Sequence, residues 1–437
     1  MQKSENYFTR LPLFYGWIVV AVAFVTMAIA VNARTSFSLL FPAILAEFQW
    51  DRSVTAGAFS IGFVASGFFT PIVGMAMDHW GPRIVIPLGA LMVIAGFLGA
   101  TTVTSPLGIY VTLGVLVISG SIAMSYISHS MFLPHWFARK RGLAIGIAFS
   151  GVGIGSITLL PWFQNIILTE GWRQACLVIA ASVVIIIPLA AYFQRQFPGD
   201  LGLEADGDGG VSDKKIRKPV DPVVDRAWAE TDWTLGMAIK TARFWWISLA
   251  YFTSMFAWYA VLVHQTIYLI EGGFDSATAA TALGLVGLFG IIGQIGIGAL
   301  SDRIGREWAW TISLSGYAVS YGALIAMAEN PSYILLYLMV AMQGILGFGL
   351  ASIYGAVTAE IFAGRRFATI FALAGLIGNL GAGSGPWVAG YIYDSTGSYQ
   401  LAFWLCIAMA GLSIFSIWMA SPRKVRLVSG QAARRAT

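Results

Sequence analysis

Twelve long apolar segments dominate this chain of 437 residues and restrict it to one class of fold. A helix needs about 20 apolar residues to cross the hydrocarbon core of a bilayer, and every segment reaches that length. Charged residues make up only 11% of the chain, against roughly 25% in soluble domains. We therefore predict an all-α membrane protein with twelve transmembrane helices, near residues 14–41, 54–77, 84–103, 107–134, 142–167, 174–194, 244–270, 277–300, 307–328, 333–360, 367–392 and 399–420.

The basic residues predict the orientation of these helices. Lys and Arg collect in cytoplasmic loops, whereas acidic residues contribute little to orientation. With the N-terminus inside, 23 of the 26 basic residues fall in cytoplasmic parts. Arg52 and Arg173 then fall on the outer side, and Arg34 lies inside a span. We expect both termini in the cytoplasm, and this topology explains the net charge of +5 without a nucleic-acid partner.

A long polar stretch divides the chain into two parts. Residues 195–243 are polar and rich in Gly, Asp and Lys, so they cannot bury enough apolar surface to fold firmly. We predict a cytoplasmic linker there, between an N-terminal six-helix bundle over 1–194 and a C-terminal six-helix bundle with a short basic tail over 244–437. Cys176 and Cys406 both fall inside predicted helices and offer neither a metal-ligand spacing nor a disulfide framework.

The two parts repeat each other at a nearly constant spacing. Asp78-His-Trp-Gly-Pro-Arg recurs 224 residues later as Asp302-Arg-Ile-Gly-Arg. Arg141-Gly-Leu-Ala recurs 225 residues later as Arg366-Phe-Ala-Thr. Such spacing indicates a duplicated six-helix unit, and in transporters built this way the substrate site lies between the repeats near the bilayer midplane.

These motifs resemble those of a known transporter superfamily. The segments from Gly74 to Arg83 and from Gly298 to Arg306 are similar to the loop motif between helices 2 and 3 of major facilitator superfamily transporters and to its echo between helices 8 and 9. The narrower resemblance is to the monocarboxylate and oxalate/formate carriers, at Tyr15-Gly-Trp, Trp136-Phe-Ala-Arg-Lys-Arg-Gly-Leu-Ala and Gly385-Pro. The resemblance spans essentially the whole chain. It implies two pseudo-symmetric bundles that transport by alternating access, and we expect a cofactor-free monomer in a prokaryotic inner membrane.

The repeated loop motif can be interpreted as a conformational latch. A carboxylate at a helix end can accept hydrogen bonds from backbone N–H groups of a neighbouring helix and pair with an Arg, while a glycine permits the tight turn. We expect the latch to hold the cytoplasmic ends of the two bundles together and to favour an outward-open state. Ordinary solvated loop residues are the alternative. The predicted latch consists of Asp78, Gly81, Arg83, Arg141, Asp302, Gly305, Arg306 and Arg366.

Arg34 is the one basic residue deep inside a predicted span, and no acid lies within twelve residues of it. A cation near the bilayer centre costs about 2.5–3.5 kcal/mol on insertion scales, so it marks a functional site by default. Its guanidinium suits a carboxylate, because it donates two parallel hydrogen bonds and stays charged when dehydrated. The resemblance implies the same role, since monocarboxylate carriers have an essential Lys on helix 1 that aligns with Arg34. Snorkelling to the headgroups or a structural hydrogen bond is the alternative.

Other polar residues within the spans complete the predicted substrate site. The repeat places His264 and Gln265 opposite Arg34 across the interface between the bundles, and it carries His129 onto Tyr354. For both histidines a hydrogen-bonded structural role is an equally good interpretation. We expect the substrate to contact Arg34, Tyr126, His129, His264, Gln265, Gln294, Tyr354 and Asn379.

Where the chain departs from the related carriers, the site loses charge. The Arg that both related families have on helix 8 aligns with Gln294, and the helix 8 Asp of the monocarboxylate carriers aligns near Gly290. The helix 11 Lys of the oxalate carriers falls at or near Gly375. One fixed cation prefers a monoanion, because a dicarboxylate would keep one charge unpaired in low dielectric. We therefore expect a monocarboxylate such as lactate, pyruvate or formate as the substrate, and not oxalate.

The distribution of acids leaves the coupling mode and one competing function open. No Asp or Glu lies at mid-depth in a predicted span, so proton symport would use His129, His264 or the substrate's own carboxyl group, and anion exchange is the other option. An efflux carrier for amphipathic or cationic compounds could use Trp258 and Tyr259 as walls but would want an acid in the cavity. A membrane sensor would be expected to carry a soluble domain, and an enzyme would need a nucleophile with a base or a metal-ligand cluster, none of which the sequence offers.

Overall fold

The structure is a computed structural model that describes residues 14–137, 141–204, 223–328, 331–362 and 367–436, except for the side chains of 141–143, 368, 429, 433 and 436. These residues are helical apart from loops and one isolated antiparallel bridge between Val223 and Arg426. The first part contains α1 (Gly16–Thr35), α2 (Phe37–Phe48), α3 (Arg52–Trp80), α4 (Pro82–Ala100), α5 (Pro106–Ile109), the π-helix η2 (Tyr110–Ile118), α6 (Ser119–Ile122), α7 (Tyr126–Trp136), α8 (Arg141–Glu170), α9 (Trp172–Val184) and α10 (Ile186–Phe193).

The described parts of the linker and of the second part of the chain are also mainly helical. The linker contains a short 3-10 helix, η3 (Pro198–Leu201), and two single-turn helices, α11 (Arg226–Ala229) and α12 (Leu235–Ala238). The second part contains α13 (Ala242–Glu271), α14 (Ser276–Ile304), α15 (Arg306–Ala326), α16 (Tyr333–Ala341), the π-helix η5 (Met342–Leu346), the 3-10 helix η6 (Gly347–Ser352), α17 (Tyr354–Ile361), α18 (Phe367–Thr396), α19 (Gln400–Ala420), η7 (Pro422–Lys424) and α20 (Ser429–Ala436).

Each predicted span coincides with helix in the structure. Within the described residues, ten helical segments are long and apolar enough to cross a membrane by length and composition. The other two predicted spans, 307–328 and 367–392, are covered by α15 and α18, which have 21 and 30 residues. The prediction of an all-α membrane protein is confirmed, and ten of its twelve spans meet these criteria.

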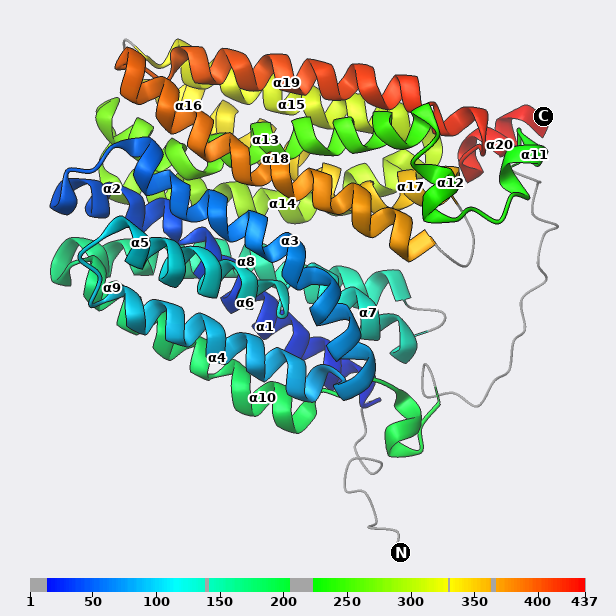
Figure 1. Cartoon of the computed structure of the whole chain (residues 1–437), viewed down its shortest axis with the longest axis horizontal. Coiled ribbons are helices and arrows are strands. Elements are labelled where there is room, and N and C mark those ends of the chain that lie inside the picture. Colours follow the sequence, from blue (N-terminus) through cyan, green and yellow to red (C-terminus); the bar gives the residue numbers. More distant parts are fainter. Residues whose placement is uncertain (1–13, 138–140, 205–222, 329–330, 363–366, 437) are drawn as a thin grey trace, which may run out of the picture.

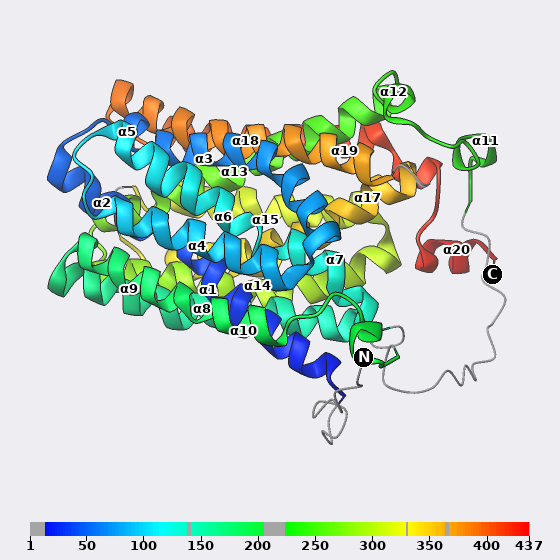
Figure 2. The same ribbon diagram turned by 60° about the horizontal axis from the view of Figure 1, so that its bottom comes forward.

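The helices form two groups that lie side by side, α1 to α10 in one and α13 to α19 in the other (Figure 1). We call these groups the N-terminal half and the C-terminal half. The long helices of both halves run along the long axis of the molecule, as the turned view also shows (Figure 2). The halves meet where α3 packs on α18 and where α8 packs on α14. We name the two ends of the bundle after Arg52, at the start of α3, and Arg306, at the start of α15.

Glycines allow the backbones of the two halves to approach each other closely. A Cβ at Gly284 of α14 would lie 2.7 Å from the carbonyl oxygen of Ser156 in α8. A Cβ at Gly390 of α18 would lie 2.7 Å from the backbone nitrogen of Ser53 in α3. In lipid, where no hydrophobic effect draws helices together, such small residues permit the close packing that holds them.

The first long helix is interrupted next to Arg34. α1 ends at Thr35 and α2 begins at Phe37, with Ser36 between them. Pro42 lies within α2, six residues after Ser36, so the carbonyl that it leaves without an intrahelical N–H donor is that of Ser38 and not one at the interruption. The interruption is a single residue, Ser36, which keeps right-handed helical backbone angles and donates to the Asn32 carbonyl at 2.8 Å, so the span continues through it and Arg34 lies in the last turn of α1.

The fourth and tenth predicted spans are interrupted as well, at matching places in the two halves. The fourth contains η2 and a break before Tyr126, the first residue of α7. The tenth contains η5 and η6 and a break before Tyr354, the first residue of α17. π-Helical stretches are often found at functional sites. Since the two tyrosines occupy equivalent places, the structure pairs Tyr354 with Tyr126, and not with His129 as the sequence offset suggested.

The second part of the linker packs on the C-terminal half at the Arg306 end. The Trp228 indole Nε1 donates to the carbonyl oxygen of Ile361 at 2.8 Å, and its ring lies against Phe362. The backbone N–H of Val224 donates to the carbonyl of Val425 at 2.9 Å, so the linker also pairs with the segment that follows α19. The described part of the linker after residue 222 is thus ordered by contacts with one half.

Candidate functional site

Arg34 lies at the interface of the halves, and no acid among the described residues compensates its charge. Its guanidinium carbon lies 5.7 Å from the centroid of the Phe63 ring of α3, and its side chain is half-buried. Among the described residues, Arg34 takes part in no ion pair and no hydrogen bond. A cation over a ring gains about 0.5–2 kcal/mol, which does not replace a carboxylate partner. The guanidinium donors are therefore available to a ligand.

Tyr259 of α13 approaches the same ring from the C-terminal half. Its ring centroid lies 4.4 Å from that of Phe63 and 5.8 Å from that of Phe59. Phe63 thus contacts Arg34 of its own half and Tyr259 of the other half. Within the described residues the Tyr259 hydroxyl forms no hydrogen bond, and the side chain is half-buried.

Tyr126 and Gln294 form a polar contact between the halves. The Gln294 Nε2 of α14 donates to the Tyr126 hydroxyl of α7 at 3.4 Å. The positive charge of Arg34 lies within electrostatic range of the Tyr126 phenol. The structure therefore brings together three of the predicted site residues, Arg34, Tyr126 and Gln294, from three different helices.

Two further predicted residues lie on the C-terminal side of this site. The Tyr354 hydroxyl lies 2.7 Å from the Ser254 Oγ of α13, the helix that also contains Tyr259. Asn379 of α18 faces α3, because a Cβ at Gly67 would lie 3.9 Å from the Asn379 Cβ and Nδ2 atoms. Both residues are therefore at or near the interface that Arg34 and Tyr259 share.

The two predicted histidines are placed away from Arg34. His129 is buried within the N-terminal half, where its Nδ1 lies 3.0 Å from the Ser125 carbonyl oxygen and its ring packs against Phe132. Its Nε2 has no hydrogen-bond partner among the described residues. His264 belongs to a network at the Arg52 end, and its neighbour Gln265 is buried with Oε1 unpaired in the described part of the chain. Substrate contact by these three residues stays a prediction.

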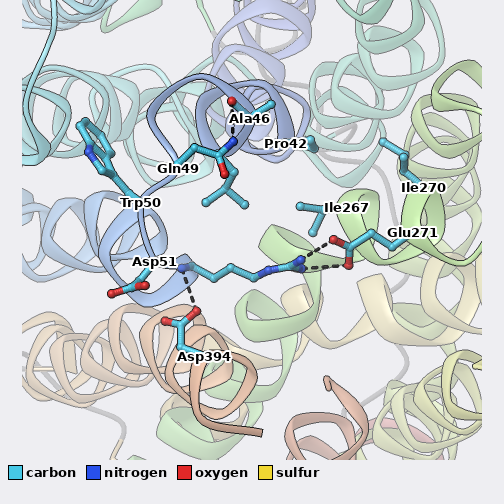
Figure 3. Close-up of a pocket in the computed structure, with 11 residues that line it drawn as sticks. Pro42, Ala46, Gln49, Trp50, Asp51, Ile267, Ile270, Glu271 and Asp394 are labelled. Atoms are coloured by element: carbon cyan, nitrogen blue, oxygen red, sulfur yellow. Dashed lines mark hydrogen bonds and ion pairs between the residues drawn. The ribbon is translucent and has the colours of Figure 1, made fainter. Parts of the chain in front are cut away.

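Arg52 joins the halves through a network that the sequence did not reveal. Its Nη1 donates to Glu271 Oε2 at 3.1 Å, and its Nη2 pairs with Glu271 Oε1 (Figure 3). Its Nη1 also donates to the Tyr399 hydroxyl at 2.9 Å. The guanidinium carbon lies 3.5 Å from the centroid of the Tyr393 ring. Asp394 accepts from the backbone N–H groups of Arg52 and Ser53 at 2.9 and 2.8 Å. A pocket of about 440 Å³ adjoins this network, lined in part by Arg52, Glu271 and Asp394.

His264 extends this network toward α18. Its Nδ1 lies 2.8 Å from the Tyr399 hydroxyl, and its Nε2 lies 2.9 Å from the Pro386 carbonyl oxygen. A carbonyl can only accept, so Nε2 carries hydrogen and Nδ1 accepts from Tyr399. The result is a continuous chain of donors and acceptors from Arg52 through Tyr399 and His264 to Pro386. The network is closed around His264, which favours the structural interpretation of this residue.

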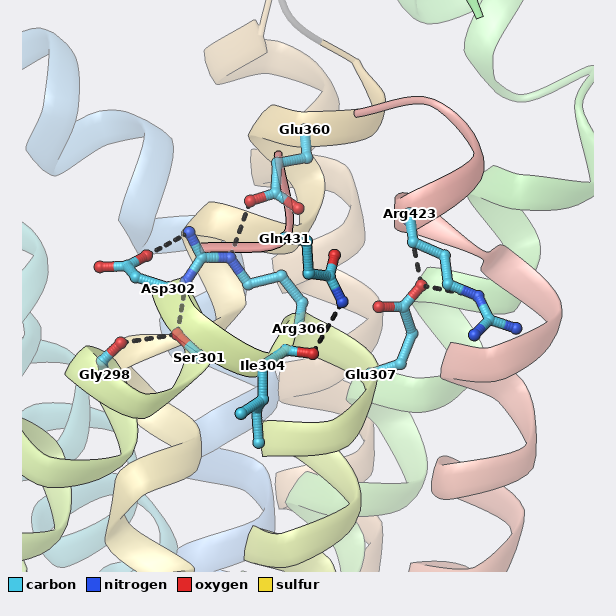
Figure 4. Close-up of polar contacts among 9 residues, drawn as sticks. All are labelled: Gly298, Ser301, Asp302, Ile304, Arg306, Glu307, Glu360, Arg423 and Gln431. Atoms are coloured by element: carbon cyan, nitrogen blue, oxygen red, sulfur yellow. Dashed lines mark hydrogen bonds and ion pairs between the residues drawn. The ribbon is translucent and has the colours of Figure 1, made fainter. Parts of the chain in front are cut away.

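The predicted latch residues of the C-terminal half form a network at the Arg306 end. Arg306 pairs with Asp302 at 2.7 Å through Nη2 and with Glu360 at 2.7 Å through Nε, and it also contacts the Ser301 hydroxyl (Figure 4). Gly305 has a φ of 107°, which favours glycine, and Gln431 of α20 donates to the carbonyl of the preceding residue at 2.7 Å. These contacts connect elements of a single half.

The corresponding residues of the N-terminal half are less connected. Gly81 has a φ of 71° and ends α3, as predicted for a tight turn. Arg83 donates through Nε to the Ala191 carbonyl at 2.9 Å, and Asp78 is exposed. The structure describes only the backbone of Arg141, at the start of α8, and Arg366 lies outside the described residues. The latch function therefore stays a prediction.

Residues 22–353 and 273–436 match the sequence profile of the Major Facilitator Superfamily. The chain belongs to this superfamily. It is therefore a transporter and not an enzyme, as expected from the sequence.

Curated relatives suggest the branch of the superfamily. Monocarboxylate transporter 13 from Bos taurus is 25% identical over 394 residues, which cover 89% of this chain and 85% of the relative. Monocarboxylate transporter 13 from Rattus norvegicus is 27% identical over 397 residues, with the same coverage. The predicted resemblance to monocarboxylate carriers is thus confirmed as a distant relationship. These relatives are mammalian, so the expected prokaryotic inner membrane finds no support, and the shown location is a membrane that the protein crosses several times.

Solved structures have the same fold. The nucleoside transporter NupG (D323A mutant) superposes with a TM-score of 0.69 at 13% identity, over 93% of this chain and 100% of that chain. The xylose transporter XylE from E. coli superposes with a TM-score of 0.65 at 15% identity, over 93% of this chain and 97% of that chain. At this level of identity the likeness concerns the fold alone.

Proposed function

We propose that this superfamily member is a secondary transporter for small organic monoanions, such as lactate, pyruvate or formate, and that Arg34 is its anion anchor. The observation that carries the proposal is the guanidinium of Arg34, which lies at the interface of the halves with no acid partner in the described part of the chain. A carboxylate would supply the missing charge and accept two parallel hydrogen bonds. The distant relationship to monocarboxylate transporters supports the same substrate class.

The surroundings of Arg34 favour a small ligand with a single charge. Phe63, Tyr259 and Tyr126 supply aromatic surface and hydroxyl groups, and Gln294 supplies an uncharged amide. A second carboxylate on the substrate would have no fixed cation to pair with among these residues, and burying it unpaired would be costly. Tyr354 and Asn379 would complete the site from the C-terminal half, while His129, His264 and Gln265 would have their predicted role only after a rearrangement.

Alternating access follows if the halves rock about this site. We propose twelve transmembrane helices with both termini in the cytoplasm, so that the Arg52 end faces outward. The polar contacts of Arg52 and Ser53 with Glu271, Asp394 and Tyr399 close the interface at that end in this structure. We accordingly infer that the structure represents a state closed to the outside. We propose that two bodies would move, residues 1–194 and residues 244–437, joined by the linker 195–243.

The mode of coupling is part of the proposal. A monocarboxylate can bring its own proton, and anion exchange would need no protein acid at all, so both modes are compatible with the uncharged surroundings of Arg34. The efflux of amphipathic or cationic compounds is less compatible, because the uncompensated charge at the interface is positive. A cation would be repelled by it.

The test is uptake of radiolabelled lactate, pyruvate, formate and acetate into proteoliposomes, with and without a pH gradient. We expect saturable uptake of at least one monocarboxylate, accelerated by an inward proton gradient in symport or by internal unlabelled anion in exchange. Oxalate should not compete at concentrations at which the monocarboxylate does. Transport of a cationic dye without any carboxylate transport would overturn the proposal in favour of efflux.

A further inference from the structure

We propose that the Tyr259 hydroxyl determines substrate specificity, by hydrogen bonding to a second polar group on the carboxylate that Arg34 holds. The preferred substrates would then be short monocarboxylates with a hydroxyl or keto group near the carboxylate. This inference rests on the proposed function and adds to it the group by which the C-terminal half recognises the substrate.

Arg34 and Tyr259 both contact the Phe63 ring, one from each half. The guanidinium carbon of Arg34 lies 5.7 Å from the centre of the Phe63 ring, and the Tyr259 ring centre lies 4.4 Å from the same point. The Tyr126 phenol lies within electrostatic range of Arg34 and accepts from Gln294 of the C-terminal half. A ligand of a few heavy atoms bound to Arg34 in this space therefore meets side chains of α13 as well as those of α1 and α3.

The hydroxyl of Tyr259 is set apart from those of the other two tyrosines on the same helix. Tyr251 shares a hydrogen bond with the Thr358 Oγ1 at 2.7 Å, and Tyr268 donates to the Leu324 carbonyl at 2.6 Å. Tyr259 has no such partner among the described residues, although its side chain is half-buried in the interface. A tyrosine hydroxyl without a protein partner bonds to water or to a ligand, so the Tyr259 hydroxyl is available to a substrate.

The position of Tyr259 also gives this contact a role in transport. Arg34 belongs to the N-terminal half and Tyr259 to the C-terminal half, so a ligand that contacts both residues binds most tightly when the halves are close around it. A ligand can shift a conformational equilibrium only through its different affinity for the two states. A substrate that contacts both residues has a large difference in affinity between the two states. A carboxylate that lacks the second polar group has a smaller difference.

Tyr259→Phe removes the hydroxyl and keeps the ring against Phe63. We measure the KM and maximal rate of lactate and propionate uptake into proteoliposomes, because propionate is lactate without its 2-hydroxyl group. In the wild type we expect lactate to have the lower KM. In Tyr259→Phe we expect the lactate KM to rise roughly five- to tenfold, as for the loss of one hydrogen bond, with the propionate KM changed less than twofold. Thermal stabilisation of the purified protein by lactate and by propionate provides a second reading without transport.

Tyr268→Phe is the matched control, since it removes a hydroxyl from the same helix that is already bonded to the Leu324 carbonyl. It should leave the ratio of lactate to propionate KM unchanged. If Tyr259→Phe alters both KM values equally, or alters neither, the Tyr259 hydroxyl does not bind the second polar group of the substrate. This inference is then overturned, while the proposed function stands. If the wild type transports neither acid nor any other monocarboxylate, the proposed function itself fails.

Discussion

The Arg52 guanidinium forms a two-armed ion pair with the Glu271 carboxylate across the interface between the halves. One arm joins Nη1 to Oε2 at 3.1 Å, and the other joins Nη2 to Oε1. The Arg52 side chain is 12% exposed and that of Glu271 is 42% exposed, so the pair is only partly screened by solvent. Since the two residues must separate for this end to open, their attraction biases the protein toward the state in which it is closed.

Glu271→Gln should shift the protein toward opening at the Arg52 end. The amide cannot pair with the guanidinium charge, so the closed state loses the ion pair but keeps the Tyr399 hydrogen bond and the Asp394 contacts. We expect a shift of roughly 1 kcal/mol, about fivefold in the ratio of the two states, for a partly exposed pair. The measurement is the alkylation rate of a cysteine introduced beside Arg52 at Ile267, which lines the pocket and is buried in this state.

The control is Glu47→Gln, which breaks the ion pair between Glu47 and Arg173 at 2.6 Å. Both of those residues belong to the N-terminal half, so this variant should not change the alkylation rate. Equal rates in wild type, Glu271→Gln and Glu47→Gln would mean that the Arg52 ion pair has no part in closing this end.

His264→Ala should destabilise the protein without altering substrate affinity. The variant removes the acceptor of the Tyr399 hydroxyl hydrogen and one donor to the Pro386 carbonyl in a buried place, at a cost of about 1–3 kcal/mol. The melting temperature of the purified protein in detergent should fall by several degrees, whereas the exposed His135→Ala should melt as the wild type does. A raised substrate KM at unchanged stability would instead favour the original prediction that His264 contacts the substrate.

The sequence was sufficient to predict the helices and to single out Arg34. Each predicted span coincides with helix because membrane crossing demands a long apolar run, which is visible without knowledge of any partner. Arg34 stands out for the same reason, since a cation in such a run is rare. The repeat and the family resemblance also directed attention to Tyr126 and Gln294, which the structure brings into contact.

The rest of the site depends on which face of a helix meets which neighbour. Phe63 and Tyr259 were not among the predicted contacts, because the chain has 28 Phe and 16 Tyr and a helix that is apolar all round does not reveal its inward face. Arg52 was interpreted as an ordinary outer-loop residue, and its partners Glu271 and Tyr399 lie more than 200 residues away. The breaks before Tyr126 and Tyr354 have no proline at the break itself and follow π-helical stretches, for which no sequence signal was evident.

Gly381→Ala and Gly375→Ala should have opposite consequences on the same helix. A Cβ at Gly381 of α18 would lie 2.1 Å from the Phe252 carbonyl oxygen of α13, so alanine there must force the two helices apart. A Cβ at Gly375 would have no neighbour within 4 Å, and alanine favours a helix by about 1 kcal/mol over glycine. We expect Gly381→Ala to lower the melting temperature markedly and Gly375→Ala to leave it unchanged or raise it. Similar melting curves for both variants would contradict the packing described for α13 and α18.

We propose that Arg34 holds the substrate carboxylate. This is tested directly by the saturable uptake of the best monocarboxylate into proteoliposomes that contain wild type, Arg34→Lys or Arg34→Gln. We expect Arg34→Gln to lose at least 90% of uptake while it folds and melts as the wild type does, because a charge-assisted contact of about 1.5–3 kcal/mol is lost. Arg34→Lys should retain partial uptake with a raised KM, since an ammonium keeps the charge but not the paired hydrogen bonds. An unchanged KM and an unchanged rate of uptake in Arg34→Gln would mean that Arg34 does not hold the substrate carboxylate.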